Sequence, residues 1–206
     1  MSRLYNRARS VKVAPIFLVG TNIMAALGKV LWLIAALVLG GSAVAADLEN
    51  TLYMDVPAGR VVIEMRPDLA PETVAQIKKL VRQGFYDGIV FHRVIDGFMA
   101  QTGDPKGDGT GGSGHKLKAE FSDEKHVRGV VSMARASDPN SADSQFFIMF
   151  APAPSLDGKY TIWGNVTSGM EYIDQIKKGD SARNGTVANP DKIIKMQVAA
   201  DAEKKS

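Results

Sequence analysis

Residues 91–104 read FHRVIDGFMAQTGD and hold the most informative pattern in the chain. An arginine and a glutamine lie among aromatic and apolar residues at alternating positions. Since side chains two apart on a strand share a face, we expect Phe91, Arg93 and Ile95 to point the same way, before a bend at residues 96–97. The residue types alone favour a core strand with one partly buried arginine, and a binding groove is the alternative.

The chain after residue 50 alternates short apolar segments with turn residues. Eight segments fit β-strands: 51–56, 60–65, 89–94, 98–101, 130–134, 145–150, 161–166 and 193–198. Two fit helices: one that opens at Pro71, has an apolar stripe and ends at Gly84, and one over 171–178. These elements predict a mainly β protein, a closed eight-stranded antiparallel β-barrel capped by two α-helices.

Charge is distributed unevenly along the 206 residues, which include 25 basic and 22 acidic side chains. Residues 1–45 hold five basic residues and no acidic one, so the remainder is slightly acidic. This distribution predicts no nucleic-acid partner. The chain has no cysteine, which excludes disulfides and thiolate chemistry.

Residues 30–39, VLWLIAALVL, form an apolar run shorter than the roughly 20 residues of a membrane-spanning helix. Lys29 precedes it and GGSAVAA follows at 40–46, a pattern typical of a secretory signal peptide cleaved after Ala45 or Ala46. An uncleaved membrane anchor and a buried helix are the alternatives. We expect a periplasmic or secreted protein that meets the membrane only through this segment.

Met24 opens a complete signal peptide by itself, and we interpret it as the true start of the protein. The predicted organisation is therefore an N-terminal extension plus signal peptide over 1–46, a folded domain over 47–200 and a polar tail over 201–206.

Several motifs carry a resemblance to one family. Residues 91–105, FHRVIDGFMAQTGDP, resemble the signature of the cyclophilins, with their F-H-R, G-F-M and Q-x-G-D. Further motifs match in the family's order: SMA at 132–134, SQFFI at 144–148, LDGK at 156–159 and a strand from Trp163 to Val166. The resemblance spans roughly Leu52 to Val198. It implies a monomeric peptidyl-prolyl cis–trans isomerase for exported, unfolded or partly folded proline-containing polypeptides, with no cofactor and no metal.

The resemblance also assigns site residues. Arg93 matches the family's catalytic arginine, and Gln101 matches the glutamine that steadies it and contacts the substrate backbone. Other matches fall at the proline pocket (Phe98, Met99, Phe147 and Leu156) and where the peptide before the proline binds (Ala134, Arg135 and Gln145). His92 matches a histidine at the pocket edge, with a purely structural role as the alternative. Tyr160 stands where the family usually has a pocket histidine.

One departure concerns a drug contact. The family's tryptophan just before L-D-G-K, which contacts cyclosporin, is Ser155 here. The resemblance therefore implies weak inhibition by cyclosporin without a change in the arginine chemistry.

The implied reaction breaks no covalent bond, so it needs no nucleophile or general base. Amide resonance sets a barrier of about 18–20 kcal/mol, and a guanidinium donor aimed at the prolyl nitrogen binds the twisted amide better than the planar one. A chaperone or binding module that holds proline segments without turnover is the alternative function. Arg93 and Gln101 favour catalysis, because gripping needs only an apolar wall.

Three other patterns are weaker. Residues 107–112, GDGTGG, match G-x-G-x-x-G, but no helix pattern follows, so we expect a glycine loop beside the cleft. The three histidines are widely spaced and form no metal motif. A hydrolase built on Ser132, His92 and Asp104 lacks a nucleophile-elbow sequence around the serine.

Overall fold

The computed structural model describes residues 47–203. The chain divides into residues 1–45 and 46–206, and every element given below belongs to the second unit. The predicted signal peptide and the proposed start at Met24 lie outside the described residues. Within the described range, no helix combines the length and apolar character needed to cross a membrane.

The described part is mainly β, as predicted. Its strands are β1 (Thr51–Val56), β2 (Gly59–Met65), β3 (Arg93–Ile95), β4 (Met99–Thr102), β5 (Val130–Met133), β6 (Phe146–Met149), β7 (Ile162–Ser168) and β8 (Lys195–Val198). Its helices are α2 (Pro71–Arg82), α3 (Met170–Asp174) and α4 (Ala199–Glu203), with four 3₁₀ turns at η1 (Leu48–Asn50), η2 (Pro139–Ser141), η3 (Pro154–Leu156) and η4 (Ser181–Arg183). The prediction of two helices was therefore wrong, because the described part has three. The helix α4 extends into the segment that the sequence assigned to a polar tail.

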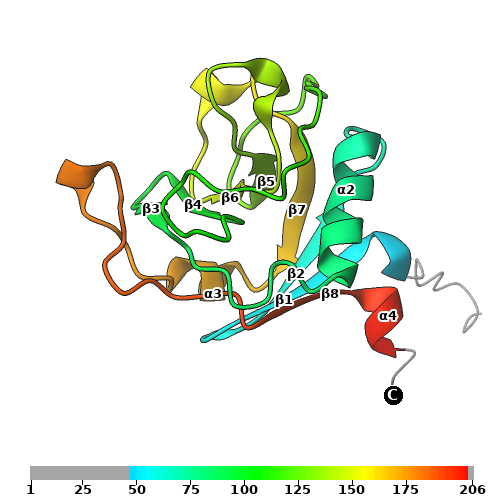
Figure 1. The fold of residues 1–206 in the computed structure, drawn as a ribbon, viewed down its shortest axis with the longest axis horizontal. Helices are drawn as coiled ribbons and strands as arrows, with labels where there is room; N and C mark the ends of the chain where they lie inside the picture. Colours follow the sequence, from blue (N-terminus) through cyan, green and yellow to red (C-terminus); the bar gives the residue numbers. More distant parts are fainter. Residues whose placement is uncertain (1–46, 204–206) are drawn as a thin grey trace, which may run out of the picture. The chain divides into compact units, whose positions relative to one another are not determined.

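The strands form one antiparallel sheet in the order β3-β4-β6-β5-β7-β2-β1-β8, curled into a half-barrel (Figure 1). The sheet is open between β3 and β8, so the prediction of a closed barrel was wrong. Isolated hydrogen bonds cross this gap, from Phe91 N–H to the Asp191 carbonyl and from Ile193 N–H to the Ile89 carbonyl, each 2.9 Å. Regular pairing stops because residues 189–190 are an asparagine at φ 53° and a proline without an N–H.

Strands β3 to β6 are covered on both faces, and alternate residues supply two separate apolar clusters. The main cluster takes Val94, Ala100, Val131, Met133, Phe146 and Ile148, and the second cluster takes Ile95, Met99, Val130, Phe147 and Met149. Phe91 belongs to the main cluster, so the prediction that it shares a face with Arg93 and Ile95 was wrong. The alternation begins only at Arg93, where regular strand geometry begins.

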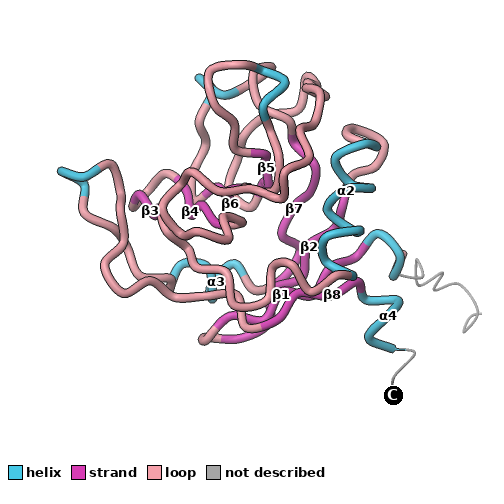
Figure 2. Tube along the Cα trace, viewed as in Figure 1, coloured by secondary structure: helices cyan, strands magenta, loops and turns pink. Residues whose placement is uncertain are grey.

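A long connection over residues 103–129, without regular helix or strand, joins β4 to β5 (Figure 2). Its Glu120 carboxylate accepts hydrogen bonds from the backbone N–H groups of Glu72 and Thr73, both at 2.9 Å, and from the Thr73 hydroxyl at 2.6 Å. The N-cap residue of α2, Ala70, offers no side-chain cap. A carboxylate from 47 residues away therefore satisfies the positive end of this helix.

We expect Glu120→Ala to lower the free energy of unfolding by about 1–2 kcal/mol, because it removes the cap of α2. Urea titration followed by circular dichroism measures this. Glu124→Ala is the matched control from the same connection. Its carboxylate is about half exposed and lies 3.7 Å from Arg66, so we expect a change of less than about 0.5 kcal/mol. Equal effects of the two substitutions would contradict the capping role.

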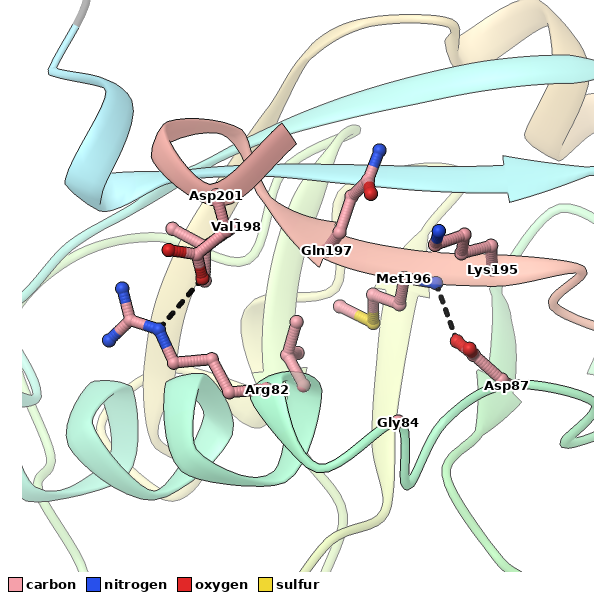
Figure 3. Close-up of a pocket in the computed structure, with 9 residues that line it drawn as sticks. Arg82, Gly84, Asp87, Lys195, Met196, Gln197, Val198 and Asp201 are labelled. Atoms are coloured by element: carbon pink, nitrogen blue, oxygen red, sulfur yellow. Dashed lines mark hydrogen bonds and ion pairs between the residues drawn. The ribbon is translucent and has the colours of Figure 1, made fainter. Parts of the chain in front are cut away.

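A groove of about 430 Å³ runs along the free edge of β8, between the end of α2 and α4 (Figure 3). Asp87 accepts the backbone N–H of Met196 at 2.9 Å, and Arg82 donates to Asp201 at 2.8 Å. These charged side chains shield the sheet edge from pairing with another strand.

Candidate active site

A cavity of about 180 Å³ lies on the side of the sheet that carries the second apolar cluster. Its lining residues are Arg93, Phe98, Met99, Gln101, Ala134, Arg135, Phe147, Leu156 and Tyr160. All nine are among the eleven site residues proposed from the sequence. The other two, His92 and Gln145, lie outside it.

Strand register brings the central side chains together. Arg93 on β3 is opposite Gln101 on β4, which is opposite Phe147 on β6, which is opposite Ser132 on β5. Directly opposed residues of antiparallel strands project from the same face. A guanidinium, an amide and an aromatic ring therefore stand in one row across three strands.

Arg93 is held on two sides. Its Nε and Nη2 donate to the backbone carbonyl and side-chain Oδ1 of Asn184, both at 3.0 Å, and its Nη1 donates to Gln101 Oε1 at 3.1 Å. Burial lowers the pKa of Arg93. The group still stays charged, because the ordinary pKa of a guanidinium is far above neutral pH. Of its five N–H donors, three are used in these bonds to oxygen, which leaves donors for a ligand.

Asn184 was not predicted from the sequence. It adopts a left-handed conformation with φ 53°, and Gly185 follows it. Asn-Gly is a strong turn signal, and asparagine tolerates this conformation. The pair could have indicated a turn, but nothing local indicates that the turn would meet Arg93, 91 residues away.

A chain of amides fixes the orientation of Gln101. The Nε2 of Gln145 donates to the carbonyls of Gly109 and Gly111, at 3.1 and 2.9 Å, so its Oε1 is the acceptor for Gln101 Nε2 at 2.9 Å. The Oε1 of Gln101 is therefore the atom that faces Arg93. The glycine loop lies beside the cleft, as expected, and supports Gln145 through its carbonyls.

The apolar walls pack on one another. The ring of Tyr160 meets Phe147 edge to face, with centroids 5.9 Å apart, and the Arg135 guanidinium lies 4.6 Å over the Tyr160 ring. Met99 and Phe147 are buried, whereas Phe98, Leu156 and Tyr160 are half-buried. Such a wall suits a small apolar ring.

His92 lies beneath the glycine loop and lines neither this cavity nor a second cavity of about 320 Å³ beside it. Its side chain is buried, and both ring nitrogens lack a hydrogen-bond partner within the described residues. Burial lowers its pKa, which favours the neutral ring. This placement suits the structural alternative that the sequence left open.

Behind Phe147 lies a polar group that the sequence did not indicate. His126 Nδ1 donates to Asp157 at 3.2 Å, and its Nε2 lies 3.1 Å from Ser132 Oγ. The Ser132 hydroxyl donates to the Thr161 carbonyl at 2.9 Å, and Ser132 is fully buried. No substrate can reach this hydroxyl, so the arrangement is not a nucleophile site. The Ser132, His92 and Asp104 triad that the sequence argued against is not formed, because the histidine beside Ser132 is His126.

Burial lowers the pKa of His126, against the opposing effect of Asp157. The unfolded chain then binds more protons than the folded one below about pH 6.5, so stability falls as pH decreases through this range. We expect His126→Gln to reduce the loss of unfolding free energy between about pH 6.5 and 5, as measured by urea titration at each pH. His115→Gln is the control at an exposed histidine. A pH slope unchanged by His126→Gln would contradict this role.

Within residues 47–203, no three His, Asp or Glu side chains cluster as a metal site. The geometry offers a fixed cationic donor at the rim of an apolar cavity. A family model described as cyclophilin-type peptidyl-prolyl cis–trans isomerase matches residues 51–198.

The chain belongs to the cyclophilins.

A protein of Brucella suis named "Probable peptidyl-prolyl cis-trans isomerase" is 58% identical over 174 residues, which cover 79% of this chain and 89% of that protein. Peptidyl-prolyl cis-trans isomerase B of Bacillus subtilis is 46% identical over an alignment that covers 59% of this chain and 85% of that protein. A Hirschia baltica cyclophilin crystal structure has a TM-score of 0.67 and 30% identity, covering 75% and 76% of the two chains.

A cyclophilin-type isomerase of Cryptosporidium parvum, crystallised in the presence of the dipeptide Ala-Pro, has a TM-score of 0.66 and 29% identity. The matched region covers 72% of this chain and 98% of the Cryptosporidium parvum chain. The described domain is thus a cyclophilin-type peptidyl-prolyl cis–trans isomerase.

Proposed function

We propose that Arg93 and Gln101 perform the isomerisation and that the 180 Å³ cavity holds the proline ring of the substrate. The observation that carries this proposal is the position of Arg93, which is fixed by Asn184 and Gln101 at the rim of an apolar cavity. Phe98, Met99, Phe147, Leu156 and Tyr160 form the wall of that cavity.

The mechanism follows from the twisted amide. When the prolyl C–N bond rotates, resonance is lost and the nitrogen regains a lone pair that can accept a hydrogen bond. A guanidinium N–H donor then binds the twisted state more strongly than the planar ground state, which lowers the barrier. Since the donor is already fixed, little reorganisation is needed during the reaction. An acceleration of about a hundred-thousand-fold requires only about 7 kcal/mol.

A protease-coupled assay on a proline tetrapeptide tests this function. We expect the purified protein to accelerate isomerisation, with a rate proportional to enzyme concentration. A protein that binds the peptide without accelerating its isomerisation would support the alternative, a module that only holds proline segments.

The proposal extends to exported clients. The sequence of residues 30–46 supports passage into the periplasm or out of the cell, where newly exported chains need slow prolyl bonds to isomerise. Expression of the full chain followed by N-terminal sequencing tests this. A mature protein that begins at Ala46 or Asp47 supports export, and an uncleaved protein in the membrane fraction supports the anchor. Size-exclusion chromatography tests the expected monomer.

Cyclosporin should inhibit this enzyme weakly. Ser155 is exposed in η3, and it provides neither the apolar face nor the N–H donor of an indole. We expect Ser155→Trp to tighten inhibition by about two to three orders of magnitude with little change in turnover. Ser168→Trp, at an exposed serine at the end of β7, is the control. Nanomolar inhibition of the unmodified protein would show that residue 155 is not the determinant.

A further inference from the structure

A second cavity, of about 320 Å³, adjoins the first and shares Gln101, Ala134 and Arg135 with it. Its other lining residues come from the connection between β4 and β5, which holds the glycine loop, and from the segment between β5 and β6. They include Lys116, Ser141, Asp143 and Gln145. Because the two cavities share three lining residues, a peptide seated in the first cavity reaches the second within a few residues.

The charges along this double groove have one dominant sign. Arg93, Arg135 and Lys116 line it, and Asp143 is the one carboxylate among its lining residues. Asp143 is buried and already accepts from the N–H and hydroxyl of Ser113 and from Gly114 N–H. It also lies 3.6 Å from the Lys116 ammonium, so within the described residues it offsets the charge of Lys116 and pairs with neither Arg93 nor Arg135.

Arg135 stands at the boundary of the two cavities without a carboxylate partner. It donates to the carbonyls of Lys159, Ala136 and Ser137, at 2.9 to 3.2 Å, and these bonds hold the guanidinium in place. Within the described residues, no Asp or Glu oxygen lies within 4.0 Å of it. Arg93 likewise has no carboxylate partner in the described part of the chain.

The geometry therefore points to a substrate preference: we propose that this cyclophilin favours proline segments that carry an acidic side chain within three residues of the proline. That side chain would enter the second cavity and lie against Arg135 and Lys116. The inference rests on the proposed seating of the proline ring in the first cavity. Arg135 is fixed by its carbonyl contacts and has no carboxylate partner among the described residues, so it can attract a carboxylate without first breaking an internal ion pair. Lys116, which is exposed and lies 3.6 Å from Asp143, adds positive charge to the same cavity.

The test uses proline peptides with Glu, Gln or Lys placed in turn at each of the three positions on either side of the proline. Exchange NMR measures isomerisation catalysed by the full chain, so that no protease preference enters the result. At the most responsive position we expect kcat/KM for the Glu peptide to be about threefold higher than for the Gln peptide and about tenfold higher than for the Lys peptide. These differences should shrink in about 0.5 M salt.

Variants locate the effect. Arg135→Gln and Lys116→Gln should each reduce the Glu-to-Lys ratio, and Arg135→Lys should retain most of it. Lys118→Gln, at an exposed lysine that lines neither cavity, should leave the ratio unchanged. If Arg135→Gln unfolds, the Lys116→Gln ratio and the salt dependence of the unmodified protein decide the question.

Different results would contradict the proposed function and the acidic preference. Absence of catalysis on every peptide overturns the proposed function. Catalysis of all peptides at rates independent of charge, or a preference that neither Arg135→Gln nor Lys116→Gln reduces, overturns the acidic preference alone.

Discussion

Replacing Arg93 with lysine should reduce kcat/KM for a proline peptide by about 100- to 1,000-fold, the usual effect of removing one preorganised donor. Lysine keeps the charge but is a compact ammonium without the planar fork that Asn184 and Gln101 hold. Arg93→Ala should lose at least as much activity. Rates come from exchange NMR and stability from thermal unfolding.

The melting temperature should change little in either variant. Arg93 lies at an open rim and has no carboxylate partner within the described residues, so its removal leaves no buried charge unpaired. Arg128→Lys is the control, because Arg128 pairs with Asp174 and lines neither cavity. Near-normal activity of Arg93→Lys or Arg93→Ala would overturn the mechanism.

Replacing Phe147 with alanine should lower peptide affinity by about 10- to 100-fold, because the ring's apolar contact with proline is worth roughly 1.5–3 kcal/mol. It should also lower stability by about 3–5 kcal/mol, since the ring is buried against His126 and Tyr160. Turnover should slow as the proline ring loses its support. Isothermal titration calorimetry measures the affinity and urea titration the stability.

A pair of leucine variants separates binding from folding. Phe147 and Phe146 are neighbours on β6, but Phe147 faces the cavity and Phe146 faces the main cluster. Phe147→Leu and Phe146→Leu should both lose stability, whereas only Phe147→Leu should lose peptide affinity. Equal affinity for the peptide in these two variants would show that Phe147 is not part of the proline wall.

Much of the fold and site was predictable because it depends on local pattern. All eight predicted strands are present, β1 with its predicted bounds and the others with shifted ends, and α2 begins at Pro71 as expected. The alternation of residues along β4 and β6 separates cavity residues from core residues, and family motifs name the cavity residues one by one. The motif residues Arg93, Gln101 and Phe147 share a row because strand register follows from this alternation.

The structure adds what depends on contacts between distant segments. Asn184 supports Arg93, Glu120 caps α2, and His126 lies between Ser132 and Asp157 behind the cavity. Each contact joins a loop residue to a partner that no local pattern identifies.

The sequence by itself thus determined the type of element, the residues of the cavity and the family. Only the tertiary structure decided that the sheet stays open between β3 and β8 and that a third helix follows β8. It also decided that Arg93 and Arg135 have no carboxylate partner within residues 47–203. The physical reason is that propensity and periodicity act over a few residues, whereas closure of the sheet, capping and charge pairing depend on which distant loops meet.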